Sequence, residues 1–289
     1  MDEYKISGTT KLVCLLGSPV AHSMSPAMHN ESFRYHGLDY RYLCFDVGEA
    51  ELDKATEGLR VMGARGWNLT MPCKNRMTDL CDRLSPAAKF CGAVNTVVND
   101  DGILTGHTTD GAGYMRAVRE AGYDLKGKTM TLLGAGGAAT AILVQAALDG
   151  LGQIRVFNRR SANLDRLSPI AEQLNAETNC RVSIHLLPDD DGLRASIADS
   201  DILTNATNVG MAPRTEACLI PDPAWFHQSL IVSDIIYNPR ETRLLSMAKE
   251  AGCPTVGGLP MLLYQGAYAF ELWTGLDMPV ELIQKKYFS

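Results

Sequence analysis

The feature that most constrains the fold is a strand, a glycine-rich turn and a helix in immediate succession between Lys128 and Leu148. The run Thr129–Leu133 is short, apolar and partly β-branched, which predicts a buried strand. Three glycines follow within four residues, and helix-forming residues then continue from Ala138 to Leu148. In this order the segment predicts the first strand, turn and helix of a dinucleotide-binding unit.

The small residues of this turn each have a physical reason. Gly134 allows a tight turn, Gly136 lets a pyrophosphate approach the backbone, and Ala139 lets helix and strand pack closely. The helix N-terminus offers unpaired N–H groups and a positive dipole end to phosphates. The alternative is an ordinary β–α turn whose glycines adopt positive φ. We therefore expect cofactor phosphates at the turn formed by Gly134, Ala135, Gly136, Gly137 and Ala138.

The next predicted strand, Ile154–Asn158, bears on the choice of cofactor. A dinucleotide-binding domain that uses NAD normally has an acid about 20 residues beyond the glycines, which binds the ribose hydroxyls. Here the strand ends in Asn158, Arg159 and Arg160, and the first acid is Asp165. A guanidinium binds a 2′-phosphate through paired, charge-assisted hydrogen bonds. The sequence thus favours NADP, with NAD possible; the alternative is that both arginines only form solvated surface.

Composition excludes several classes of protein. The chain has 289 residues, enough for two domains, and an apolar content of 46% that supplies normal cores. Its net charge is −6, without a long basic run, which disfavours nucleic acid or an anionic membrane as a partner. No apolar stretch approaches the length of a membrane span. The eight cysteines contain no CxxC pair, so we expect reduced thiols, a cytoplasmic protein and no metal site.

Strands and helices alternate along the chain, which predicts an α/β fold with mostly parallel sheets. We expect an N-terminal α/β domain over residues 1–110 and a Rossmann-type doubly wound domain over residues 111–257. An Asp-Gly turn between two apolar runs predicts one hairpin in the first domain, near residues 93–105. From physical arguments alone, the terminal helices of residues 258–289 could pack on either domain.

Polar residues gather where strands of the first domain end, which is the edge where α/β folds bind ligands. Ser23 and Ser25 follow the strand Lys11–Leu16, and their hydroxyls would suit a polyhydroxylated substrate. The other reading of Ser25 is the N-cap of a helix that starts at Pro26.

The predicted strand Trp67–Met71 has the same property. It carries Asn68 and Thr70 and is followed by Lys74, which could also be an ordinary surface lysine. Asn95 lies within an apolar strand, where its amide needs a partner. Asp110 precedes a predicted helix, Gly111–Glu120, and could be only its N-cap.

Taken together, the motifs resemble the shikimate dehydrogenase family along nearly the whole chain, and most of all its quinate/shikimate dehydrogenase branch. The motifs that carry the resemblance are His22-Ser-Met-Ser-Pro26, Asn68-Leu-Thr-Met-Pro-Cys-Lys74, Gly92-Ala-Val-Asn-Thr96, Thr109-Asp-Gly111, Gly134-Ala-Gly-Gly-Ala138, Asn158-Arg-Arg160, Asn205-Ala-Thr207 and Gln265-Gly-Ala267.

The resemblance implies reversible oxidation of shikimate to 3-dehydroshikimate by hydride transfer to NADP or NAD, and of quinate to 3-dehydroquinate as a second activity. It implies that Lys74 and Asp110 form the catalytic pair and that the terminal helices complete the N-terminal domain. The residues that it implies for the substrate are Ser23, Ser25, Asn68, Thr70, Asn95, Tyr237 and Gln265. Thr207 and Gly258 join the turn and the arginines as cofactor contacts.

Elementary chemistry agrees with this pair, because oxidation of an alcohol needs a base, and a lysine can serve when burial lowers its pKa. Two departures from the family pattern stand out: Thr108 replaces a common Asn, and Ser161 stands where an acid can favour NAD. The alternatives are a nucleotide-sensing binding protein or another bi-domain NADP dehydrogenase, of the methylene-tetrahydrofolate type. We expect a small-molecule partner and a monomer or homodimer.

Overall fold

The computed structural model describes residues 5–288 and divides the chain into two compact units. The first unit comprises the residues up to Thr109 and those from Leu263 onward, and the second is Asp110–Leu262. The sequence predicted the divisions at 110/111 and 257/258. The later division lies inside a helix, α10, because Leu259–Thr274 is helical without a break.

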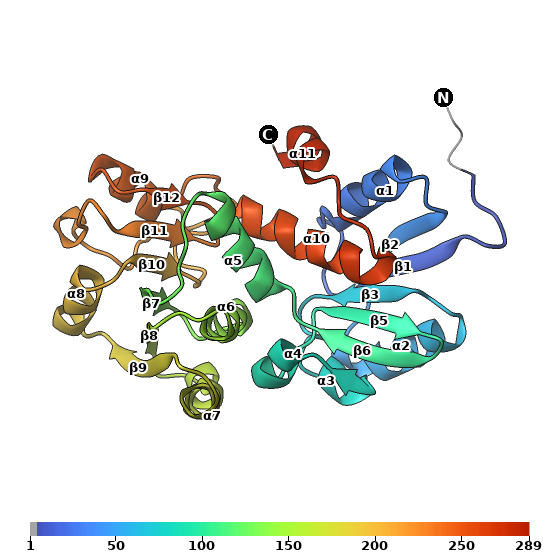
Figure 1. Ribbon diagram of the computed structural model, residues 1–289, viewed down its shortest axis with the longest axis horizontal. Helices are drawn as coiled ribbons and strands as arrows, with labels where there is room; N and C mark the ends of the chain where they lie inside the picture. Colours follow the sequence, from blue (N-terminus) through green and yellow to red (C-terminus); the bar gives the residue numbers. More distant parts are fainter. Residues whose placement is uncertain (1–4, 289) are drawn as a thin grey trace. The chain divides into compact units, whose positions relative to one another are not determined.

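The first unit is built on a six-stranded mixed sheet with the order β2-β1-β3-β5-β6-β4 (Figure 1). Its strands are β1 Lys11–Gly17, β2 Tyr40–Asp46, β3 Gly66–Leu69, β4 Arg83–Leu84, β5 Thr96–Asp100 and β6 Ile103–His107. Strands β1, β2 and β3 are parallel, whereas β5 is antiparallel to both β3 and β6. The hairpin between β5 and β6 confirms the predicted turn, in which Asp101 and Gly102 adopt positive φ of 51° and 89°.

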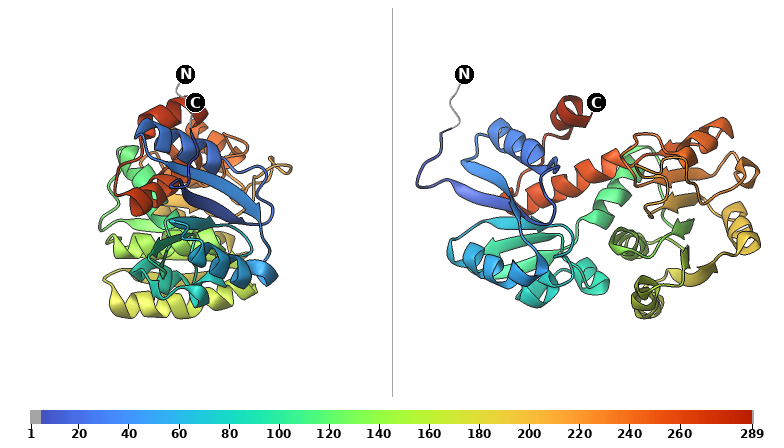
Figure 2. Two further views of the ribbon diagram at one scale, coloured as in Figure 1. Left: turned by 90° about the vertical axis from the view of Figure 1, so that its right-hand side faces the viewer. Right: turned by 180° about the vertical axis from the view of Figure 1, so that it is seen from behind.

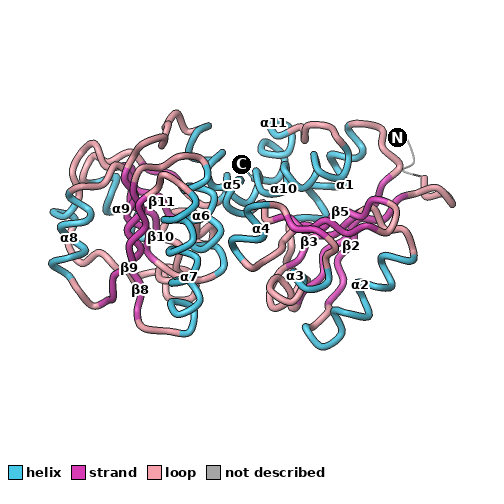
Figure 3. The backbone as a smooth tube through the Cα atoms, turned by 60° about the horizontal axis from the view of Figure 1, so that its bottom comes forward, coloured by secondary structure: helices cyan, strands magenta, loops and turns pink. Residues whose placement is uncertain are grey.

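Helices cover both faces of this sheet. They are α1 Ser25–Tyr35, α2 Leu52–Val61, α3 Met77–Leu80, α4 Pro86–Cys91, α11 Val280–Ile283 and the part of α10 after Leu262, with a 3₁₀ turn at Glu49–Glu51 and a π-helical turn at Gln284–Phe288. Figure 3 shows α2 and α3 on one face and α1 and α10 on the other. The first face holds a core of Trp67, Leu69, Met77 and Val97.

The last helices join the first unit through specific contacts. Trp273 Nε1 donates to the Val97 carbonyl at 2.9 Å, and its ring occupies the space that a Cβ on Gly66 would need. Arg65 Nε donates to the Trp273 carbonyl at 2.8 Å. Figure 2 shows α11 beside α1, where Lys286 pairs with Glu31 at 2.8 Å. These contacts attach the end of α10 and the segment after it to the N-terminal sheet.

Three local predictions in this unit are wrong by one or two residues. Ser25 is not an N-cap: α1 begins at Ser25, Met24 holds the cap position, and the Ser23 Oγ accepts the Ser25 N–H at 3.2 Å. Strand β3 ends at Leu69, because the chain turns there and Cys73 N–H reaches the Thr70 carbonyl. Asn95 precedes β5.

The second unit confirms the predicted doubly wound domain. Its six strands are all parallel, in the order β12-β11-β10-β7-β8-β9, so the chain starts in the middle of the sheet and winds outward on both sides (Figure 1). The strands are β7 Thr129–Leu133, β8 Gln153–Arg159, β9 Arg181–Leu187, β10 Ile202–Asn205, β11 Ile231–Asp234 and β12 Thr255–Val256. The direction of winding changes between β7 and β10, where such folds bind their ligands.

Its helices are α5 Asp110–Glu120, α6 Gly137–Leu148, α7 Ala162–Glu177, α8 Asp190–Ala198 and α9 Arg243–Glu250, with a 3₁₀ turn at Pro223–Trp225. Figure 3 shows α6 and α7 on one face of the sheet and α8 and α9 on the other. Asp110 is the first residue of α5 and not its N-cap. Among residues 5–288, every helix is too short or too polar to cross a bilayer.

Candidate active site

In the first unit, the loops after β1 and β3 contact each other. A Cβ built on Gly17, at the end of β1, would lie 2.3 Å from the Thr70 side chain, and Ser18 N–H donates to the Met71 carbonyl at 2.9 Å. Lys74 lies in the turn that follows and is half-buried; its carbonyl accepts the Val94 N–H at 2.9 Å. The fold thus places Thr70 and Lys74 on loops that are tied to their neighbours.

A buried network of hydrogen bonds holds the two predicted asparagines. Asn68 Oδ1 accepts from the Tyr42 hydroxyl at 2.7 Å, and Asn68 Nδ2 donates to the Asn95 carbonyl at 3.1 Å and to Thr96 Oγ1 at 2.9 Å. Asn95 Nδ2 in turn donates to Thr109 Oγ1 at 3.0 Å, and its Oδ1 accepts the Thr109 N–H at 2.8 Å. The network fixes both amides and ends one residue before Asp110.

The predicted serines belong to the same region. Burial raises the pKa of the Tyr42 phenol well above its ordinary value, and the Ser25 hydroxyl opposes this rise. Ser23 contacts the Cys44 thiol of β2 in addition to the Ser25 N–H. The sequence had indicated both serines but gave no sign of Tyr42, which reads as an ordinary strand aromatic.

Gln265 projects from α10 at a point where this helix lies very close to α1. A Cβ on the next residue, Gly266, would lie 2.1 Å from the Met28 side chain of α1. The glycine therefore sets the separation of the two helices, and with it the position of Gln265 beside the helix that begins at Ser25.

The structure does not bring all predicted site residues into one unit. Asp110 opens α5, the first element of the second unit, and Tyr237 follows β11 there with half of its surface exposed. The remaining predicted substrate residues and Lys74 all belong to the first unit.

The glycine turn of the second unit has the geometry that dinucleotide phosphates require. Gly134 adopts a φ of +116°, and a Cβ there would lie 2.8 Å from the Ala206 carbonyl, at the end of the neighbouring strand β10. Gly136 and Gly137 have open space on the side where a Cβ would stand, and α6 begins at Gly137. Ala139 is buried against the sheet, as predicted. Open backbone at a helix N-terminus fits a phosphate.

Two arginines stand at the end of β8, Arg159 as its last residue and Arg160 directly after it. Arg159 and Arg160 are exposed, and neither forms an ion pair within residues 5–288. Asn158 Nδ2 donates to the Arg159 carbonyl and to Ser161 Oγ, and the Ser161 Oγ also accepts the Leu164 N–H as the N-cap of α7. Ser161 therefore starts the helix, while the guanidinium groups extend from the loop.

A buried carboxylate that sequence reasoning missed supports the remaining cofactor residue, Thr207. Thr207 Oγ1 donates to Asn205 Oδ1 at 2.7 Å, and Asn205 Nδ2 donates to both oxygens of Asp234 at 3.1 Å. Asp234 also accepts from Thr242 Oγ1 at 2.7 Å and from the Ile236 N–H at 3.0 Å. Burial raises the pKa of this carboxyl, and these donors oppose the rise.

Gly258, the last predicted cofactor residue, precedes α10. A Cβ there would lie 2.1 Å from the Ile235 carbonyl at the end of β11. Gly258 and Thr207 therefore follow or contact the carboxyl ends of β11 and β10, the same edge of the sheet that Gly134 occupies. Within residues 5–288, no group of three His, Cys, Asp or Glu side chains could hold a metal ion.

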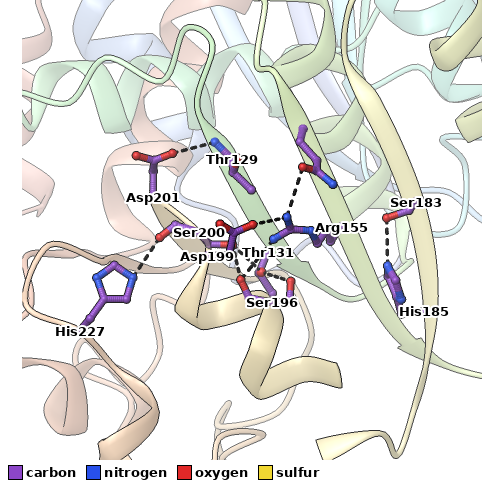
Figure 4. A network of polar contacts seen from close by, with 11 residues as sticks. Thr129, Thr131, Arg155, Ser183, His185, Ser196, Asp199, Ser200, Asp201 and His227 are labelled. Atoms are coloured by element: carbon purple, nitrogen blue, oxygen red, sulfur yellow. Dashed lines mark hydrogen bonds and ion pairs between the residues drawn. The ribbon is translucent and has the colours of Figure 1, made fainter. Parts of the chain in front are cut away.

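The opposite edge of the second sheet has a cavity of about 330 Å³, lined in part by Lys128, Asp201 and His227. Figure 4 shows two of the hydrogen bonds here, between Asp201 and Thr129 and between His227 and Ser200. Lys128 pairs with Asp201 at 3.0 Å, Asp201 accepts the Thr129 N–H, and the His227 ring bonds the Ser200 carbonyl. These bonds connect the polar groups at the amino ends of β7 and β10.

The chain matches two models of known protein domains. The model of the shikimate dehydrogenase substrate binding domain matches residues 15–97, and that of the shikimate 5′-dehydrogenase C-terminal domain matches residues 258–286. The chain is 52% identical to a shikimate dehydrogenase (NADP(+)) of Listeria innocua over 98% of each chain. It is 44% identical to a quinate/shikimate dehydrogenase of Escherichia coli over 97% of each.

A solved structure agrees with the match in sequence. Shikimate 5-dehydrogenase from Listeria monocytogenes, crystallised with shikimate and NAD, is 52% identical and has a TM-score of 0.95 over 97% of both chains. Because the likeness covers both units and their connections, the chain belongs to the shikimate dehydrogenase family.

Proposed function

We propose that this protein is a shikimate dehydrogenase that oxidises shikimate to 3-dehydroshikimate reversibly, with NADP as the preferred cofactor. The observation that carries the proposal is the 52% identity over nearly the full length to a shikimate dehydrogenase (NADP(+)). A family match of this extent also sets aside the methylene-tetrahydrofolate type of dehydrogenase. Retention of both Lys74 and Asp110 argues against a sensor that has lost catalysis.

The proposed roles follow from the chemistry of the side chains. Nicotinamide, when bound, supplies the acceptor or donor of the hydride. Lys74 and Asp110 would jointly exchange the proton of the reacting hydroxyl, as an acid–base pair. Asn68, Asn95 and Gln265 orient the ring hydroxyls, together with Thr70 and Tyr237. Ser23 and Ser25 offer hydroxyl donors to the carboxylate.

The preference for NADP rests on the exposed Arg159 and Arg160 and on the absence of an acid at position 161. The glycine turn, Gly134 to Ala138, would hold the pyrophosphate, and Thr207 and Gly258 line the same sheet edge. Quinate is proposed as a second substrate, because a relative that is 44% identical is named for both substrates. The eight cysteines form no disulfide among residues 5–288, which fits a reducing compartment such as the cytoplasm.

The test is an assay of nicotinamide absorbance in which shikimate and quinate are each combined with NADP and NAD. We expect the largest kcat/KM with shikimate and NADP. Turnover mainly with quinate, or mainly with NAD, would overturn the ranking of substrate or cofactor. Absence of turnover in all four combinations would overturn the proposed function itself.

The proposed pair is tested by Lys74→Ala, with Lys89→Ala as the matched control. Lys89 is an exposed lysine in the last turn of α4, in the same unit. Loss of acid–base catalysis predicts a fall in kcat of at least ~100-fold for Lys74→Ala. Lys89→Ala should keep the wild-type rate. A Lys74→Ala enzyme that is folded and retains more than a tenth of wild-type kcat would exclude the role.

A further inference from the structure

The hydroxyl of Tyr42 bonds Asn68, a residue proposed to bind the substrate. Tyr42 lies in β2, is 1% exposed, and donates its hydroxyl proton to Asn68 Oδ1 at 2.7 Å. A phenol has a single proton, so the bond to Asn68 uses the only one that Tyr42 can donate. Tyr42 itself is too deeply buried to act as an acid or base towards a ligand in solution.

This arrangement determines the polarity of Asn68. An amide side chain can turn over and exchange its oxygen and nitrogen unless its partners prevent it. Here both amide protons are used, on the Asn95 carbonyl and on Thr96 Oγ1, and the oxygen accepts from Tyr42. In this orientation Asn68 can offer a substrate only the second lone pair of Oδ1. It can therefore accept a bond from a substrate hydroxyl, but it cannot donate one.

Aromatic side chains pack against the ring of Tyr42 and do not hydrogen-bond its hydroxyl. Its ring is stacked on the His29 imidazole, with centroids 4.7 Å apart and planes 12° from parallel. The Trp273 ring packs beside both rings, with its centroid 5.1 Å from that of His29 and 6.1 Å from that of Tyr42. The phenol is thereby held at one position against α1 and α10, the helices that carry Ser25 and Gln265.

We infer that Tyr42 is a positioning residue for substrate recognition, whose hydroxyl locks Asn68 as a hydrogen-bond acceptor. The inference rests on the proposed function for the identity of the substrate, but the orientation of Asn68 can be measured without a substrate. Tyr42→Phe removes the hydroxyl, keeps the ring and leaves Asn68 Oδ1 without its buried donor.

The matched control is Tyr114→Phe. Tyr114 is also 1% exposed, and its hydroxyl bonds the Thr204 hydroxyl at 2.6 Å, but it lies in the second unit. Both variants lose one buried hydroxyl of the same kind, so a general loss of stability should appear in both. Only Tyr42→Phe should change recognition of the substrate.

The first readout is kinetic. We expect Tyr42→Phe to raise the KM for shikimate about tenfold, equivalent to ~1.4 kcal/mol, and to leave the KM for NADP unchanged. In an Asn68→Ala background the same change should add nothing, because the group that Tyr42 orients is gone. An unchanged KM for shikimate, or an equal rise in the Asn68→Ala background, would refute the inference.

The second readout needs no turnover. The two side-chain amide protons of Asn68, assigned in ¹⁵N spectra by their loss in Asn68→Asp, should exchange slowly in the wild type and in Tyr114→Phe. They should exchange faster or shift in Tyr42→Phe. Unchanged Asn68 signals in Tyr42→Phe would overturn the inference even if the protein acts on another substrate, whereas failure of the proposed function alone would leave this result intact.

Discussion

His29 is expected to make the first unit sensitive to acid. Its side chain is fully buried in α1, packed against the rings of Tyr42 and Trp273, and neither ring nitrogen has a hydrogen-bond partner within residues 5–288. Burial alone lowers the pKa of this histidine from its ordinary 6.5 to about 3. The imidazole is therefore neutral in the folded protein at every pH at which the enzyme is assayed.

The sign and size of the effect follow from linkage. The folded pKa lies below the unfolded one, so the unfolded chain takes up the proton first and stability is lost as the pH falls from 6.5 towards 3. At pH 5 the pH lies about 1.5 units below the pKa of the unfolded histidine. Protonation therefore stabilises the unfolded chain by about 2 kcal/mol. The loss relative to pH 7.5 is therefore about 2 kcal/mol from this single residue.

The perturbation is His29→Leu, which has similar volume, favours a helix and cannot be protonated. Urea unfolding at pH 7.5 and pH 5.0, followed by tryptophan emission, measures the effect, because Trp67 and Trp273 are both buried in the first unit. We expect the wild type to lose about 2 kcal/mol more than the variant between the two pH values. The exposed His22, changed to Gln, is the control and should behave as the wild type.

An equal loss of stability in the wild type and in His29→Leu would refute this reasoning. It would mean that the folded protein accommodates the protonated ring. The difference in stability between the two proteins at pH 7.5 measures separately the packing contribution of the aromatic stack with Tyr42, which is expected to be worth about 0.5–1.5 kcal/mol.

Three further predictions concern the second unit. Gly111→Ala should cost about 1–3 kcal/mol of stability, because its Cβ would lie 2.1 Å from the Ala141 carbonyl where α5 packs on α6. Thermal melting measures the loss, and Gly58→Ala in α2 is the control, since a Cβ there has no close neighbour. Asp234→Asn should cost about 1–3 kcal/mol, since an amide N–H₂ would face the donors Asn205 and Thr242; the same melts test it, and an unchanged melting temperature would contradict it. Arg159→Ala with Arg160→Ala should raise the KM for NADP at least ~10-fold and spare NAD; an equal rise for both cofactors would exclude 2′-phosphate recognition.

The second unit could be predicted well because its signals are local. Thr129–Leu133 and the helix after Gly137 are adjacent in the chain, and the requirement for positive φ at Gly134 is a property of the turn itself. The parallel arrangement of its strands follows from the repeated alternation of strand and helix. In this unit, residues within about 20 positions of one another in the chain determine the local fold.

Contacts between distant residues could not be predicted in this way. Ser25 has the sequence of an N-cap, yet it is the first residue of α1, and the cap position falls on Met24. Asp234 reads as the polar end of an apolar strand, and only the fold shows that Asn205 and Thr242 surround it. Each of these roles depends on which strands become neighbours in the sheet, and single-residue patterns do not specify this.

Strand β3 shows how the two kinds of information combine. Alternation along a strand sends Trp67 and Leu69 to one face, where they enter the hydrophobic core, and Asn68 to the other. Periodicity therefore predicts that Asn68 points away from this core, but not what it meets. The sheet order places β1 next to β3 and β2 next to β1, and Tyr42 reaches Asn68 from two strands away. A buried amide such as that of Asn68 needs hydrogen-bond partners, and this need restricts which side chains can surround it. The site therefore includes Tyr42, which lies behind the residues proposed to touch a substrate.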